Sequence, residues 1–137
     1  MKMITAALAL FISAAIFAPA QAAKVSPTEI NGATTVDAAT AKQLFDRGVV
    51  FVDVRKNSDW EAGRVPGAVH LELKKVLSED KLVKVASKAT EIVMYCNGAK
   101  CMRSSKAAAK AVSWGFAKVY YFRDGFPAWE AAGYAVE

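Results

Sequence analysis

Short apolar runs alternate along the chain with longer segments in which alanine, leucine and charged residues predominate. The runs at residues 49–54 and 91–95 are mostly apolar, which is typical of parallel strands covered on both faces. Shorter runs rich in β-branched or aromatic residues predict three further strands, at residues 34–36, 68–71 and 117–122. Between the strands the sequence predicts one helical turn around Trp60 and helices at residues 38–47, 78–86, 104–114 and 127–132.

Capping residues mark the ends of several of these helices. Asp37 precedes one predicted helix and is a preferred N-cap residue, and the Ser-Glu-Asp sequence at residues 78–80 can cap the start of another. Gly48 and Gly115 follow the ends of two others, where glycine readily adopts a left-handed backbone. This order of strands and helices predicts an α/β fold built on a mainly parallel sheet.

The amino-terminal segment, residues 1–22, has the pattern of a secretory signal peptide. A basic residue precedes an apolar run at residues 4–17, and Ala-Gln-Ala at residues 20–22 matches a cleavage motif. The run is shorter than the roughly 20 residues needed to span a bilayer, so no stable membrane insertion is expected. The sequence therefore predicts a periplasmic protein, with a lead-in segment at residues 23–33 and one domain at residues 34–137.

Composition and charge exclude several classes of function. The formal net charge is +5, and the basic residues are scattered apart from Lys74 and Lys75, which favours weak attraction of small anions over a nucleic-acid surface. The single histidine, His70, lies in a predicted strand and is interpreted as structural. A serine-type triad therefore lacks a base, a metal site lacks ligands, and no cofactor is expected.

Both cysteines lie on a short link between a predicted strand and a predicted helix. Cys96 directly follows the apolar run at residues 91–95, and Cys101 comes five residues later. Functional sites in parallel sheets lie beyond the carboxyl ends of the strands, and both Cys96 and Asp53 are expected at such ends. An exported protein meets an oxidising compartment, so a structural disulfide, a redox pair and a nucleophile all remain open.

Several ordered motifs resemble a single rhodanese domain, from about residue 35 to the end of the chain. They are FVDVR at 51–55, WEAGRVPGA at 60–68, VMYC at 93–96, RS at 103–104, GF at 115–116 and DGFPAW at 124–129. The resemblance implies five parallel strands flanked by helices. It also implies that Cys96 is a nucleophile that takes sulfane sulfur as a persulfide and passes it to a thiophilic acceptor.

The chain departs from the common small rhodanese pattern in its active-site loop. Arg103 stands seven residues after Cys96, whereas the common loop places an arginine five residues after the cysteine. The loop also carries Cys101, which could resolve a Cys96 persulfide, protect Cys96 from over-oxidation or fill space. Arg64 replaces the histidine often found before the Pro-Gly-Ala sequence. Loop length determines which donors fit, so donor and acceptor stay open.

Physical chemistry independently supports a reactive Cys96. A thiolate is the nucleophile, and successive backbone N–H groups, the start of a helix and nearby cations lower a thiol pKa. Lys100 and Arg103 supply charge, and Gly98 permits a tight curve. The predicted anion-binding loop consists of Asn97, Gly98, Ala99, Lys100, Cys101, Met102 and Arg103.

Residues outside the loop are assigned supporting roles. Asp53 is expected to accept hydrogen bonds from the loop backbone or from the arginine at the end of the loop. Arg55 and Glu61 are predicted to form a structural ion pair, and Trp60 is predicted to line the rim of the cleft.

Three functions remain as hypotheses at this point. The first is a sulfurtransferase or persulfide carrier that takes sulfur from a small anionic donor, such as thiosulfate, to cyanide or a thiol, including a protein thiol. The second is a thiol–disulfide redox module that uses Cys96 and Cys101. The third is a rhodanese-fold binding module without turnover.

Overall fold

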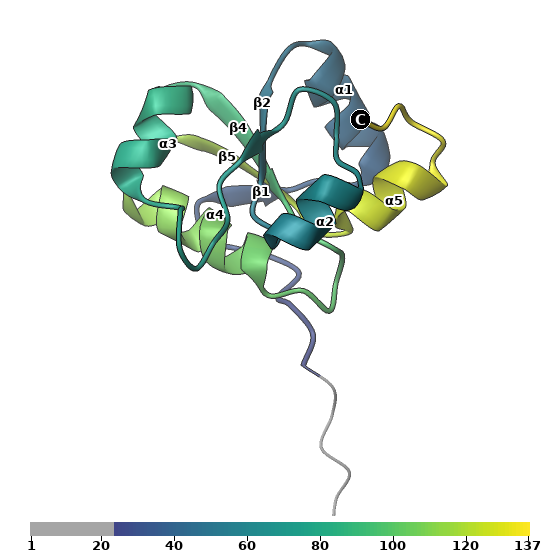
Figure 1. The fold of residues 1–137 in the computed structure, drawn as a ribbon. Coiled ribbons are helices and arrows are strands. Elements are labelled where there is room, and N and C mark those ends of the chain that lie inside the picture. Colours follow the sequence, from purple (N-terminus) through teal and green to yellow (C-terminus); the bar gives the residue numbers. More distant parts are fainter. Residues whose placement is uncertain (1–23) are drawn as a thin grey trace, which may run out of the picture.

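The structure is a computed structural model that describes residues 24–137. The predicted signal peptide, residues 1–22, lies outside the described residues. Figure 1 shows a sheet with helices on both sides. The strands are β1 (Ala33–Thr35), β2 (Val50–Asp53), β3 (Val69–His70), β4 (Glu91–Tyr95) and β5 (Lys118–Phe122).

The five strands form one parallel sheet in the order β1-β5-β4-β2-β3. The predicted α/β class and the parallel sheet are confirmed. Strands β4 and β2 occupy the middle of the sheet, where both faces are covered, and this explains their nearly continuous apolar sequence. The predicted strand at residues 34–36 lies one residue earlier, at Ala33–Thr35.

Five helices connect or follow the strands. They are α1 (Ala38–Asp46), α2 (Asn57–Ala62), α3 (Glu79–Val85), α4 (Arg103–Ser113) and α5 (Gly125–Ala131). Two predicted caps are confirmed, because the side chain of Asp37 accepts a hydrogen bond from the Thr40 N–H and that of Ser78 accepts one from the Lys81 N–H. The last helix begins two residues before the predicted start, at Gly125.

Two hydrophobic clusters pack against opposite faces of the sheet. One joins β-strand residues such as Ile92 and Met94 to α3 and α4, and it includes Cys96. The other joins Phe51 and Tyr95 to α1 and α5. Successive strand residues point to opposite faces, so β4 contributes to both clusters and is fixed from both sides.

Parallel order brings the carboxyl ends of the central strands together. Asp53 at the end of β2 is the register partner of Tyr95 at the end of β4, and Cys96 follows immediately. The two residues that the sequence places at strand ends are therefore neighbours across the sheet. Within residues 24–137, no helix has the length and apolar character that a membrane crossing requires.

Candidate active site at the carboxyl edge of the sheet

The two cysteines are joined by a disulfide. Cys96 and Cys101 are bonded, with their Cα atoms 6.4 Å apart. Cys96 is only 1% exposed, whereas Cys101 is partly exposed. The chain thus brings the predicted nucleophile and the second cysteine into direct contact, and the Cys96 sulfur is not free in this state.

The first half of the loop is held close to the start of α5. The Phe126 N–H donates to the Cys96 carbonyl oxygen at 2.9 Å. Gly125, at φ +62°, leaves room for this approach, because a Cβ there would lie 2.2 Å from that oxygen and 3.0 Å from the Gly98 nitrogen. The D-G-F sequence at the start of α5 therefore acts as a backbone support for Cys96.

The lead-in segment holds the middle of the loop. The backbone N–H and the hydroxyl of Ser26 both donate to the Ala99 carbonyl oxygen, at 2.7 and 2.8 Å. The Ser26 carbonyl oxygen accepts in turn from the Arg123 guanidinium. Ser26 is buried, so part of the predicted lead-in segment belongs to the site. Sequence reasoning missed this contact, because nothing in the local pattern links residue 26 to residue 99.

A buried ion pair lies beneath the loop, and its partners differ from those predicted. Asp53 accepts from Arg55 Nε at 3.0 Å and from Arg55 Nη2 at 2.7 Å, and it also accepts from the Tyr95 hydroxyl at 2.7 Å. The expectation that the loop backbone or Arg103 would donate to Asp53 is wrong. The predicted pair of Arg55 with Glu61 is also wrong, because Arg55 folds back to the carboxylate two residues before it.

This ion pair connects the sheet to the loop. Besides its bonds to Asp53, the Arg55 guanidinium donates to the Gly63 carbonyl oxygen at 2.6 Å and to the Asn97 side-chain oxygen at 3.3 Å. Asn97 also donates to Asp59 at 2.9 Å. Arg55 therefore fixes the first loop residue after Cys96.

The charges of the ion pair are compatible with its burial. Burial alone would lower the pKa of Arg55, but the hydrogen bonds and charge of Asp53 outweigh it and raise that pKa above its ordinary value. Burial, together with the charge of Asp53, also raises the pKa of Tyr95, so its hydroxyl remains a donor. The Tyr95 oxygen accepts from the Val65 N–H at 3.2 Å and thereby fixes the segment that leads to β3.

Arg103 begins α4 and is bound by a carboxylate. Its Nη1 donates to Glu72 and to the Val54 carbonyl oxygen. This ion pair lowers the pKa of Glu72 to about 2, against an opposing effect of burial, and the Lys75 N–H also donates to Glu72. Arg103 thus lies at the side of the loop, on the segments that follow β2 and β3, and its role in anion binding stays a prediction.

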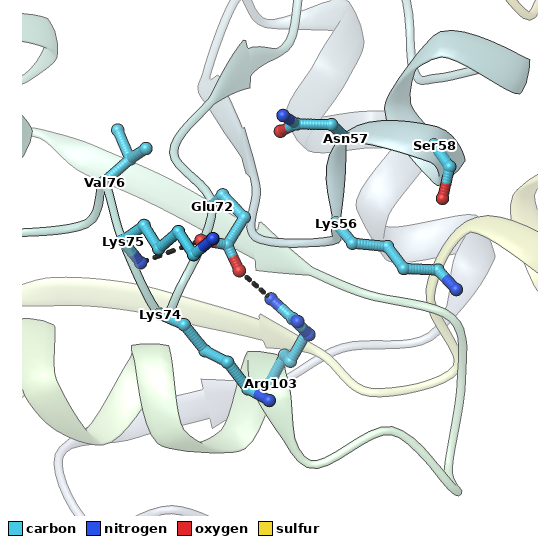
Figure 2. Close-up of a pocket in the computed structure, with 8 residues that line it drawn as sticks. All are labelled: Lys56, Asn57, Ser58, Glu72, Lys74, Lys75, Val76 and Arg103. Atoms are coloured by element: carbon cyan, nitrogen blue, oxygen red, sulfur yellow. Dashed lines mark hydrogen bonds and ion pairs between the residues drawn. The ribbon is translucent and has the colours of Figure 1, made fainter.

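A cationic pocket adjoins Arg103, as Figure 2 shows. It has a volume of about 410 Å³. Within residues 24–137, its lysines have no carboxylate within ion-pair distance, and its single acidic residue is already paired with Arg103. The pocket therefore carries uncompensated positive charge beside the loop. Its lining consists of Lys56, Asn57, Ser58, Glu72, Lys74, Lys75, Val76 and Arg103.

Several polar groups in and next to the loop have no hydrogen-bond partner within residues 24–137. In the part of the chain from residue 24 onward, no hydrogen-bond acceptor is assigned to the backbone N–H of Gly98, Ala99 or Lys100. The buried hydroxyl of Ser104, the second residue of α4, likewise lacks a partner within that range. Lys100 is exposed and Met102 is partly exposed. The loop therefore contains the unpaired N–H groups that an anion site requires.

The remaining candidate residues surround the site without joining it. The His70 ring lies 4.7 Å from the Trp60 ring in a stacked arrangement, and His70 Nε2 lies 2.8 Å from the Arg55 carbonyl oxygen. The Arg64 guanidinium covers Trp60 at 4.4 Å from the ring centroid. These contacts fit the structural interpretation of His70. Within residues 24–137, no group of three or more histidine, cysteine or acidic residues is placed to hold a metal ion.

A family model described as "Rhodanese-like domain" matches residues 37–132. The chain belongs to the rhodanese-like family. The match covers every element of the rhodanese-like domain except β1, and it begins after the lead-in segment that holds the loop.

Similar proteins of known name include both sulfurtransferases and larger proteins. The chain is 30% identical over 89 residues to the thiosulfate sulfurtransferase GlpE of Pseudomonas fluorescens, covering 65% of this chain and 77% of the relative. It is 37% identical over 87 residues to a tRNA uridine(34) hydroxylase of Buchnera aphidicola, covering 60% of this chain and 27% of the relative. It is 32% identical over 105 residues to an HTH-type transcriptional regulator of Mycobacterium tuberculosis, covering 74% of this chain and 45% of the relative. The chain thus spans less than half the length of these two larger relatives.

Solved structures show the same rhodanese-like fold. The BH2092 protein from Bacillus halodurans matches with a TM-score of 0.68 and 30% identity over 77% of each chain. The Alr3790 protein from Anabaena matches with a TM-score of 0.65 and 27% identity, over 74% of this chain and 90% of that one.

Proposed function

We propose that the protein is an exported sulfurtransferase in which Cys96 carries sulfane sulfur as a persulfide. The observation that carries the proposal is the position of Cys96, which opens a loop with unpaired N–H groups at the carboxyl end of β4 in a rhodanese-like domain. The chain is 30–32% identical to thiosulfate sulfurtransferases, and this similarity agrees with the proposed reaction.

The reaction begins from the reduced loop. The Cys96 thiolate attacks the outer sulfur of thiosulfate, the sulfur–sulfur bond of thiosulfate breaks, and sulfite leaves with the electron pair. The outer sulfur stays on Cys96 as a persulfide. A thiophilic acceptor, such as cyanide or a thiol, then takes that sulfur and returns Cys96 to the thiolate.

The surroundings of Cys96 support both its reactivity as a thiolate and the binding of an anionic sulfur donor. The free loop N–H groups and the start of α4 stabilise negative charge on a thiolate or a persulfide. Lys100 and the cationic pocket raise the local concentration of a dianion such as thiosulfate. A protein thiol is a suitable acceptor, because the partly exposed loop lies at the edge of the sheet.

The test is thiosulfate-to-cyanide sulfur transfer by protein that has been reduced and freed of reductant. Cys96→Ser is expected to abolish transfer, whereas Cys101→Ser is expected to keep measurable activity because its nucleophile remains. Normal activity in Cys96→Ser would refute the proposal. The predicted export is tested by cell fractionation and amino-terminal sequencing, which should find a periplasmic protein that begins near Ala23.

The disulfide favours a second candidate function, a thiol–disulfide module that exchanges electrons without carrying sulfur. The two functions differ in one measurement. A redox module reacts with dithiols but leaves thiosulfate intact, whereas a sulfurtransferase releases sulfite from it.

A further inference from the structure

The two ends of the disulfide differ in burial and in anchoring. Cys96 is 1% exposed, and its carbonyl oxygen is held by the Phe126 N–H at the start of α5. Cys101 is partly exposed, and its N–H donates only to Gly98 within the same loop. The Cys96 side is therefore fixed to the domain, while the Cys101 side belongs to the surface of the loop.

We propose that Cys101 resolves the Cys96 persulfide, releases the transferred sulfur as hydrosulfide and leaves the disulfide that the structure contains. The inference rests on the proposed sulfurtransferase function, because its first intermediate is the Cys96 persulfide. It adds a second activity, the reduction of sulfane sulfur to sulfide with electrons from a dithiol.

The resolving step balances without an external oxidant. Cys101 loses its thiol proton and its sulfur attacks the Sγ of Cys96. The bond between Cys96 Sγ and the outer sulfur breaks, and the outer sulfur leaves with the electron pair as hydrosulfide, which carries the proton. The sulfane sulfur is reduced, the two cysteine sulfurs are oxidised, and the product is the Cys96–Cys101 disulfide.

The loop favours this step over transfer to an external acceptor. The observed bond shows that the folded loop brings the Cys101 sulfur to the Cys96 sulfur. A reactant on the same short loop acts at an effective concentration on the order of millimolar or above. An external acceptor must instead reach a sulfur on a residue that is almost fully buried.

The disulfide must then be reduced, and the different exposure of its two cysteines determines which sulfur is attacked. A partner thiolate can approach the partly exposed Cys101 sulfur, while Cys96 is shielded. Attack on Cys101 breaks the disulfide and releases Cys96 as the thiolate, which the loop N–H groups stabilise and which is therefore the better leaving group. The partner's second thiol attacks the partner sulfur of the mixed disulfide, and Cys101 leaves and takes the proton.

The partner is accordingly a reduced dithiol, whose two thiols become a disulfide in each cycle. Thiosulfate and the dithiol are consumed, and sulfite, hydrosulfide and the oxidised partner are formed. The exposed Lys100 and the cationic pocket next to Arg103 favour the approach of a partner thiolate.

A single-turnover experiment tests the resolving step. Fully reduced protein, freed of reductant, is mixed with thiosulfate, and sulfite, sulfide and intact mass are measured. The wild-type protein should release one sulfite and one sulfide per chain and lose two hydrogen atoms in mass. Cys101→Ser should release one sulfite and no sulfide, and should gain one sulfur atom. That gain also shows that the variant is folded and that its Cys96 still forms the persulfide.

The outcomes separate this inference from the function on which it rests. If wild-type protein releases sulfite but keeps the persulfide and yields no sulfide, the resolving role of Cys101 is refuted while the sulfurtransferase function stands. If neither sulfite nor sulfide appears, the sulfurtransferase function fails and the inference fails with it.

The point of attack is tested with glutathione as a monothiol probe. The oxidised protein is mixed with glutathione, free thiols are alkylated at once, and the peptides are mapped. Glutathione should be found on Cys101 and the alkyl group on Cys96. The reverse labelling would overturn the assignment of Cys101 as the entry point for the reductant.

Discussion

Replacement of Arg55 by methionine should destabilise the domain strongly, because it leaves the buried Asp53 without its ionic partner. Asp53 is 0% exposed and accepts hydrogen bonds from both Nε and Nη2 of Arg55, in addition to the bond from Tyr95. Methionine keeps the apolar contact with Phe126, over which the guanidinium lies at 4.5 Å, and removes the charge.

The expected magnitude follows from the burial of the pair. Removing one partner of a buried ion pair costs about 3–5 kcal/mol, because the remaining charge stays away from water. For a domain of this size, such a loss lowers the melting temperature by about 10–20 °C. The loss of the bond to Asn97 adds a local effect, since the first loop residue after Cys96 is released.

A double-mutant cycle with urea unfolding measures the effect. Arg55→Met and Asp53→Asn are compared with the double variant, all in the oxidised form so that the disulfide is constant. The double variant should be less destabilised than the sum of the single variants, since no charge remains uncompensated. Lys118→Met, at the amino end of β5 and away from the ion pair, serves as a control for loss of a positive charge. A loss below about 1 kcal/mol in Arg55→Met, which is typical of an exposed pair, would refute the buried ion pair.

Three further predictions concern the surroundings of the loop. Arg103 lowers the pKa of Glu72 from 4.5 to about 2, so the ionised Glu72 stabilises the fold at pH values above 4.5, and this stabilisation should be lost as the pH falls from 4.5 towards 2. Acid unfolding of Glu72→Gln should lack this pH dependence, and a profile equal to that of the wild-type protein would contradict the pairing. Gly125→Ala should lower the free energy of unfolding by about 2–5 kcal/mol in urea titrations, because its Cβ meets the Cys96 carbonyl oxygen and its backbone is left-handed. Lys74→Gln should raise the KM for thiosulfate at low salt and less so at high salt, while Lys118→Gln on the opposite edge should not; equal effects of the two changes would exclude a local role of the pocket.

Local sequence determined the elements of this protein. The apolar runs of β2 and β4 predicted buried parallel strands, because only strands covered on both faces bury every side chain. Asp37 and Ser78 correctly marked the starts of α1 and α3, because a cap acts on N–H groups within the next few residues. The position of Cys96 at the end of a buried strand followed from the same reasoning. The resemblance of the motifs to a rhodanese domain implied the five parallel strands.

Tertiary structure alone decided the partners of the charged side chains. Arg55 turned back to Asp53 rather than to Glu61, and Arg103 bound Glu72 from the turn after β3, because burial makes an ion pair depend on which carboxylate is near in space. Ser26 holds Ala99 across 73 residues of sequence, a contact that no local pattern encodes. The choice among a disulfide, a redox pair and a nucleophile also stayed open in the sequence, because it depends on how the loop folds and which sulfur it leaves at the surface.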